Sequence, residues 1–237
     1  MSIARRVAVV TGGNRGIGLE ICRQLAGLDY HVVLTARDAD RADEQARSLD
    51  ASCTGEVSGL GLDVVDGPSV EAAFRHVRKQ HGRIDVLVNN AGIAVDGAEH
   101  RPSSPDFTRI RRTLETNLLG AWRCCAEVVP SMRARGYGRI VNLSSTMASL
   151  ELTRSSTSPA YRISKTGLNM LTRTLAIELN GTGILVNAAS PGYTRTDMSP
   201  DAERPVEAGA DTPVWLATLP GTGPTGQFFL DRRALAW

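Results

Sequence analysis

Short apolar runs alternate along the chain with longer segments in which apolar residues recur at helical spacing. The runs cover residues 7–10, 32–34, 60–62, 84–88, 140–143, 184–188 and 228–230. Most of them are continuous rather than alternating, which is typical of strands covered by helices on both faces of a parallel sheet. The segments between them are long enough for crossover helices. The pattern therefore predicts a doubly wound α/β fold around a seven-stranded parallel sheet.

The chain of 237 residues contains no internal repeat and no low-complexity linker. Segments 101–105 and 154–159 are rich in Pro and Ser, and we interpret them as loops that precede helices. The simplest organisation is one domain over residues 1–237.

Charge and composition exclude several classes of protein. Lys and Arg number 27 against 25 acidic residues, and aromatic residues make up 5% of the chain. Without a basic stripe or stacking platforms, we expect no nucleic-acid partner. No segment approaches the roughly 20 apolar residues of a membrane span, and residues 1–6 leave no room for a signal peptide. The sequence thus predicts a cytoplasmic protein that has no membrane partner.

The four cysteines, Cys22, Cys53, Cys124 and Cys125, do not have the spacing of metal ligands. We therefore expect reduced, mostly packed thiols and no metal site.

A glycine-rich loop is the first candidate for chemistry. Residues 11–18, Thr-Gly-Gly-Asn-Arg-Gly-Ile-Gly, follow the first predicted strand and open a helix with apolar residues Ile21, Leu25 and Leu28. Glycine lets the backbone turn sharply and approach a pyrophosphate, and the free N–H groups at a helix start favour its negative charge. Strand, loop and helix in this order predict a Rossmann-type domain that binds a dinucleotide.

The end of the second predicted strand indicates which dinucleotide binds. An acidic residue there would hydrogen-bond the ribose of NAD and repel a 2′-phosphate, but this chain has Ala36 followed by Arg37. Arg37 and Arg15 could clamp the phosphate of NADP, so we predict NADP(H) rather than NAD(H). The alternative is that both arginines are solvated surface groups.

Tyr161 and Lys165 lie four residues apart in a helical pattern and therefore share one helix face. A free phenol has a pKa near ~10 and transfers protons poorly at neutral pH. An adjacent ammonium favours the phenolate, so we expect Lys165 to lower the pKa of Tyr161 towards the working range. The pair predicts a proton donor.

With these landmarks the chain resembles the short-chain dehydrogenase/reductase superfamily, and most of all its carbonyl-reductase-like branch. The matching blocks follow family order and span nearly the whole chain. They are residues 11–18, Asp63, residues 89–92, Asn117, residues 138–145, Tyr161 with Lys165, and Pro191 with Gly192.

The resemblance implies a hydride transfer between a nicotinamide and a carbonyl carbon, catalysed by Asn117, Ser145, Tyr161 and Lys165. Tyr161 would be the general acid, and Ser145, or alternatively Ser144, would hydrogen-bond the carbonyl oxygen. Lys165 would hold the nicotinamide ribose and tune Tyr161. Asn117 would order a water that links Lys165 to solvent, and its place inside a helical pattern also suggests a kink.

The glycine loop and the resemblance together give a set of expected cofactor-binding residues. Asp63 would accept from the adenine amino group, and Thr194 and Thr196 would meet the nicotinamide carboxamide. The set comprises Gly12, Asn14, Arg15, Gly16, Ile17, Gly18, Arg37, Asp63, Val64, Asn89, Ala91, Gly92, Tyr161, Lys165, Pro191, Gly192, Thr194 and Thr196.

The expected substrate is a small carbonyl compound or the corresponding alcohol. Apolar candidates to line its site are Met147, Leu150, Leu152, Tyr193 and Met198. They suggest a hydrophobic ketone, aldehyde or quinone, and core packing is their alternative role. The aromatic tail, with Phe228, Phe229 and Trp237, could cover substrate or a neighbouring subunit.

Mammalian carbonyl reductases carry a long insertion between the catalytic serine and tyrosine, which is associated with a monomeric state. Only 15 residues separate Ser145 from Tyr161 here. The helices that contain Asn117 and Tyr161 are then free to pair with copies of themselves, so we predict a homodimer or homotetramer.

Two alternatives to a carbonyl reductase remain at this stage. One is an NADP-linked dehydrogenase that works mainly towards alcohol oxidation. The other is a regulator that binds a dinucleotide without catalysis. The four retained residues Asn117, Ser145, Tyr161 and Lys165 argue against it.

Overall fold

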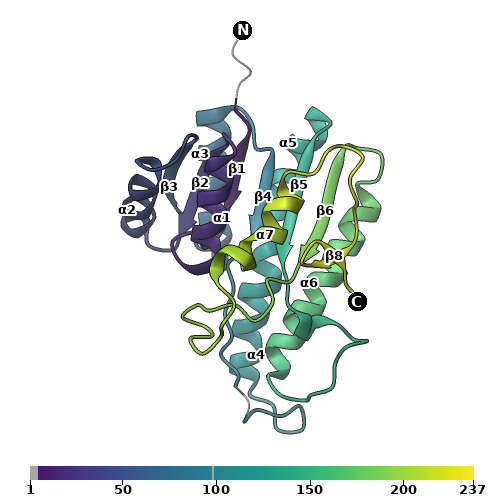
Figure 1. Cartoon of the computed structure of the whole chain (residues 1–237). Helices are drawn as coiled ribbons and strands as arrows, with labels where there is room; N and C mark the ends of the chain where they lie inside the picture. The colour runs from purple at the N-terminus through teal and green to yellow at the C-terminus, as the bar shows by residue number, and fades with distance from the viewer. Residues whose placement is uncertain (1–4, 98) are drawn as a thin grey trace.

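The computed structural model describes residues 5–97 and 99–237. Residues 1–4, on which the prediction about the signal peptide depends, lie outside the described residues. All strands belong to one sheet with the order β3-β2-β1-β4-β5-β6-β7-β8 (Figure 1). The strands are β1 Val7–Val10, β2 His31–Ala36, β3 Glu56–Gly61, β4 Val86–Asn89, β5 Gly138–Leu143, β6 Ile184–Ala189, β7 Phe228–Leu230 and β8 Arg233–Ala234.

The predicted doubly wound sheet is confirmed, with one difference at its edge. The strands β1 to β7 are parallel, as each of the seven apolar runs predicted. The expected count of seven strands is wrong by one, because the two-residue β8 pairs antiparallel with β7. Polar Arg233 and exposed Ala234 give β8 no apolar run, so hydropathy alone does not reveal it.

Helices cover both faces of the sheet (Figure 1). The α-helices are α1 Gly16–Gly27, α2 Ala39–Asp50, α3 Gly67–His81, α4 Phe107–Leu114, α5 Ala121–Arg135, α6 Pro159–Glu178 and α7 Val206–Ala217. A π-helical turn, η1 Glu115–Gly120, joins α4 to α5, and a short 3₁₀ turn, η2 Thr146–Ala148, follows β5.

The two faces of β1 explain why its sequence is apolar throughout. Ala8 and Val10 pack into a core cluster together with residues of α1, α2 and α7. Val7 and Val9 point to the opposite face and pack into a second cluster with residues of α3 and α5. Because neighbouring side chains of a strand point to opposite faces, a sheet that is covered twice needs apolar residues at every position.

The loops that matter for function follow the carboxyl ends of parallel strands. The glycine loop follows β1, residues 90–97 follow β4, η2 follows β5, and residues 190–199 follow β6. Since β1, β4, β5 and β6 are four consecutive strands of the sheet, their loops meet at one edge, where ligands of open α/β sheets bind. Among the residues that the structure describes, no helix is both long and apolar enough to cross a membrane.

Candidate active site

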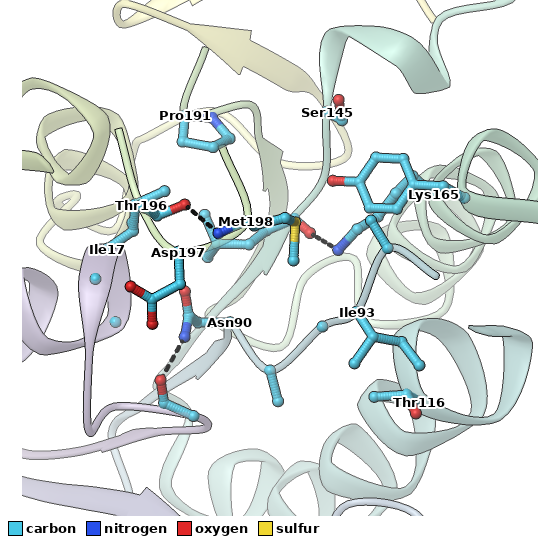
Figure 2. Close-up of a pocket in the computed structure, with 18 of the residues that line it drawn as sticks. Ile17, Asn90, Ile93, Thr116, Ser145, Lys165, Pro191, Thr196, Asp197 and Met198 are labelled. Carbon is cyan, nitrogen blue, oxygen red and sulfur yellow. Dashed lines mark hydrogen bonds between the residues drawn. The ribbon is translucent and has the colours of Figure 1, made fainter. Parts of the chain in front are cut away.

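A cavity of about 960 Å³ opens at the carboxyl edge of the sheet. The glycine loop lines one end of it, and Ser145, Tyr161 and Lys165 line another part. Figure 2 shows Ile17, Thr196 and Asp197 on one side of this cavity and Ser145 and Lys165 on the other. One continuous cavity therefore joins the predicted phosphate site to the predicted catalytic residues.

The glycine loop leaves space that side chains would fill. Gly12 and Gly16 have φ angles of +61° and +54°, which glycine adopts without strain. A Cβ atom at Gly18 would lie 2.3 Å from Asn90 Nδ2 and 2.4 Å from the Gly12 carbonyl oxygen. The loop thus passes close to residues 90 and 91 and opens α1 with its N–H groups toward the cavity edge, an arrangement that fits a pyrophosphate.

Of the expected cofactor-binding residues, all but one line this cavity. The exception is Asn89, because it lies on β4 with its side chain directed into the core. Its Nδ2 donates to Asn142 Oδ1 at 2.9 Å and contacts Cys125 Sγ at 3.2 Å. The Asn89 side chain therefore does not face the cavity, and a contact between Asn89 and the cofactor stays a prediction.

The neighbouring Asn90 lines the cavity instead, and sequence reasoning missed it. Its Nδ2 donates to the carbonyl oxygens of Thr11 and Gly12, each at 2.9 Å, and so fixes the start of the glycine loop. The alternation of side chains along β4 could have identified it, since adjacent residues must face opposite sides.

Arg15 and Arg37 both line the cavity and are exposed. The Arg15 guanidinium lies 2.7 Å from the carboxylate of Asp197, which belongs to the loop after β6. This pair is about 70% exposed on both sides, so its stabilisation is small, on the order of 0–1 kcal/mol. A dianionic phosphate could replace Asp197 as the partner of Arg15 at little cost.

The catalytic candidates converge from β5 and α6. Ser145 follows β5 and caps η2, where its Oγ accepts from Met147 N at 3.2 Å. Tyr161 lies in the first turn of α6, and its phenol lines the same part of the cavity as Ser145. Lys165, one turn later, is buried, and its Nζ donates to the Leu143 carbonyl oxygen at 2.6 Å (Figure 2).

The electrostatics of the pair differ from the sequence expectation. Burial raises the pKa of Tyr161, and only the hydrogen bond with Ser145 lowers it. Burial also lowers the pKa of Lys165 to about 8, because the ammonium loses solvation. The expected lowering of the Tyr161 pKa by Lys165 is not seen, because the Lys165 amine has already lost its proton at the pH where the phenol titrates. Lys165 can therefore act on Tyr161 as a cation only below about pH 8, from an Nζ that lies 5.8 Å from the Tyr161 ring centre.

Asn117 lies in the π-helical turn η1 and is buried outside the cavity lining. Its side chain accepts from Ile93 N at 2.8 Å and donates to Ile93 O at 2.9 Å and to Ser164 Oγ at 3.0 Å. A Cβ atom at Gly92 would lie 3.4 Å from both Asn117 Oδ1 and Lys165 Nζ, so Gly92 lies beside both side chains. The suggested irregularity of the helix at Asn117 is present as the π turn.

The expected apolar lining divides into two groups. Met147, Tyr193 and Met198 line the cavity. Leu150 and Leu152 do not: they are 74% and 45% exposed, so neither the substrate site nor the core contains them. They belong to the loop between η2 and α6.

The aromatic tail packs against its own chain. Trp237 stacks on Phe228 with ring centres 5.7 Å apart, and its carbonyl oxygen accepts from Glu151 N and Ser149 Oγ. Phe229 meets Trp215 of α7 edge to face. These contacts hold the C-terminus against β7 and the loop after η2.

The chain is similar to known proteins over most of its length. The family model of the short chain dehydrogenases matches residues 6–206. Carbonyl reductase (NADPH) 1 of Homo sapiens is 38% identical over 288 aligned positions that cover all of both chains. Carbonyl reductase (NADPH) 3 of Mus musculus is 35% identical, also over both whole chains.

A solved structure described as ElxO with NADP bound superposes with a TM-score of 0.85 at 27% identity, covering 94% of this chain and 96% of that one. The alignment with the human protein is longer than the 237 residues of this chain, so the human protein carries segments that this chain lacks.

Proposed function

The chain belongs to the short-chain dehydrogenase family, and from this premise we propose that it is an NADPH-dependent carbonyl reductase. One observation carries the proposal: Ser145, Tyr161 and Lys165 line the same cavity as the glycine loop. The relatives named as NADPH carbonyl reductases support the cofactor and the reaction. Retention of all three side chains also disfavours a regulator without catalysis.

The glycine loop, Arg15 and Arg37 would hold the phosphates of NADPH, with both guanidinium groups near the 2′-phosphate. Asp63 and Val64, after β3, would border the adenine, and Thr194 and Thr196 would border the nicotinamide. When bound, NADPH supplies the hydride that reduces the carbonyl carbon.

The protein's part in this reaction is alignment and proton transfer. The Ser145 hydroxyl donates a hydrogen bond to the carbonyl oxygen and holds it beside the Tyr161 phenol. Tyr161 then donates its proton to that oxygen as negative charge develops there. Lys165, charged below about pH 8, favours the phenolate that remains and hydrogen-bonds the ribose hydroxyls of the cofactor.

The proposed substrate is a small hydrophobic ketone, aldehyde or quinone. Met147, Tyr193 and Met198 contribute apolar surface to the cavity, and Tyr193 and Met198 are at least half exposed. Both belong to the segment after β6, in which the Tyr193 hydroxyl donates to Asp201 and Met198 N donates to Thr196 Oγ1. An apolar, accessible site of this kind favours uncharged carbonyl compounds.

The test is turnover by the purified protein. We expect loss of NADPH absorbance with at least one member of a panel of quinones, diketones, aldehydes and β-ketoacyl thioesters. Tyr161→Phe should lower kcat by about 10²- to 10⁴-fold, the usual contribution of a positioned acid, while NADPH still binds. Equal rates for parent and variant on every accepted compound would exclude Tyr161 as the acid.

The structure also bears on assembly, and we propose that the chain forms a homodimer or homotetramer through α6 and the neighbouring η1–α5 segment. Ile163, Met170 and Ile177 are spaced seven residues apart on α6 and are each more than half exposed. Trp122, on α5, is 52% exposed. Exposed apolar residues on one helix face are typical of an interface, and a second copy of the chain would bury them.

The cytoplasm is the proposed compartment. All four cysteines are free, and Cys22, Cys124 and Cys125 are buried. Burial raises the pKa of these three thiols and keeps them in the unreactive form. Unpaired cysteines suit a reducing environment.

A further inference from the structure

The first turn of α6, which carries Tyr161, is not capped by its own N-terminal residue. Ser158 precedes the helix with a φ angle of +52°, and its side chain makes no capping hydrogen bond. The cap comes from Asp96, in the loop after β4. Its Oδ2 accepts from Ala160 N at 2.7 Å, and both carboxylate oxygens lie 3.3–3.4 Å from Tyr161 N.

Asp96 is only 6% exposed and borders the cavity. A carboxylate in such a place is unfavourable unless hydrogen bonds and charge compensate it. The free N–H groups and the positive end of the α6 dipole supply both. These hydrogen bonds link the loop after β4 to the backbone of the catalytic tyrosine.

The backbone carbonyl of Tyr161 is fixed from the other side. It accepts from Ser164 Oγ at 2.7 Å, and Ser164 Oγ in turn accepts from Asn117 Nδ2 at 3.0 Å. Asn117 also binds both backbone groups of Ile93, three residues before Asp96. The loop 93–96 and the turn η1 thus hold Tyr161 through its N–H and its carbonyl group at once.

We propose that Asp96 is a positioning residue for the reduction, which holds the first turn of α6 so that the Tyr161 phenol meets the carbonyl oxygen bound by Ser145. This inference rests on the proposed function. A displacement of about 1 Å at a reacting group can lower the rate by ~10²-fold without loss of substrate binding. Asp96 would therefore act on kcat rather than on cofactor affinity.

The test compares Asp96→Ala and Asp96→Asn with Asp106→Ala. Asp106 is a matched control, because it caps α4 through Thr108 N and Arg109 N but does not line the cavity. We expect Asp96→Ala to lower kcat about 10- to 100-fold with unchanged KM for NADPH. Asp96→Asn keeps an oxygen that can accept from Ala160 N and should restore most of kcat, while Asp106→Ala should resemble the parent.

Amide hydrogen exchange supplies a readout that needs no turnover. Asp96→Ala should speed exchange at Ala160 and Tyr161 and leave the strands of the sheet unchanged. The proposal is overturned if kcat falls no more in Asp96→Ala than in Asp106→Ala. It is also overturned if Asp96→Ala speeds exchange throughout the molecule and weakens NADPH binding. If the parent reduces no carbonyl compound, the proposed function fails, and local exchange still decides whether Asp96 anchors the turn.

Discussion

At the scale of single residues, the site is governed by the cost of burying charge. Lys165 is one of two lysines in the chain, and its amine is enclosed beside the Leu143 carbonyl. Desolvation lowers its pKa to about 8, so its charge is lost at a pH where an exposed lysine keeps it. The side chain can therefore couple the acidity of Tyr161 to pH.

The first prediction follows from the sign of this shift. Below about pH 8 Lys165 is an ammonium that favours the phenolate; above it the amine is neutral and the phenol becomes a weaker acid. We expect kcat for carbonyl reduction to fall as pH rises through about 8, approaching about tenfold per pH unit. Lys79→Ala, at the exposed second lysine, should keep the same profile. A rate that stays constant from pH 6.5 to 9.5 would contradict the role of Lys165.

The second prediction concerns the choice of cofactor. Arg37→Ala should raise the Kd for NADPH about 10- to 100-fold, because a charge-assisted hydrogen bond contributes about 1.5–3 kcal/mol. The Kd for NADH should not change. Arg47→Ala, an exposed arginine of α2 outside the cavity, is the control. Isothermal titration calorimetry with both cofactors measures the effect. An equal rise in the Kd for NADPH and for NADH would show that Arg37 does not recognise the 2′-phosphate.

At the scale of elements, polar contacts between strands and helices fix the frame of the site. Asn142 on β5 accepts from Asn89 of β4 and donates to Thr172 Oγ1 of α6 at 2.8 Å. All three residues are buried. This chain of hydrogen bonds joins two strands to the helix that carries Tyr161 and Lys165.

The third prediction tests that frame. Asn142→Ala should lower the free energy of unfolding by about 1–3 kcal/mol, because buried donors and acceptors of Asn89 and Thr172 lose their partner. Chemical denaturation measures the loss. The control is Thr174→Ala on α6, the helix that carries Thr172. The Thr174 hydroxyl donates only to carbonyls one turn before it, so this variant should lower the free energy of unfolding less. Equal losses for the two variants would mean that the inter-element bonds add little.

At the scale of the whole molecule, an exposed apolar face remains on α6. Met170 is 64% exposed and lies between Ile163 and Ile177 on the same face. A single folded chain gains nothing from three such side chains, whereas an interface with another copy would bury them.

The fourth prediction is that the parent is a dimer or tetramer by light scattering at micromolar concentration, and that Met170→Glu shifts it towards the monomer. A buried carboxylate without a partner would oppose assembly. Leu28→Glu changes an exposed leucine at the C-terminal end of α1 and should leave the assembly unchanged. A monomeric parent would refute the proposed assembly directly.

The sequence by itself determined the seven parallel strands and the glycine loop that follows the first of them. The reason is local: strands covered on both faces need apolar residues at every position, and a glycine loop between strand and helix marks a phosphate site. The pairing of Tyr161 with Lys165 was predictable from a local pattern too, because a spacing of four residues places two side chains on one face of a helix.

Only the tertiary structure decided features that depend on distant segments. The direction of Asn89 into the core and of Asn90 into the cavity depends on the register of β4 beside β1 and β5. The raised pKa of Tyr161 depends on what encloses the phenol, and the cap from Asp96 depends on a loop 64 residues before Ala160. Burial and long-range hydrogen bonds arise only when the chain has folded, so a local sequence pattern does not predict them.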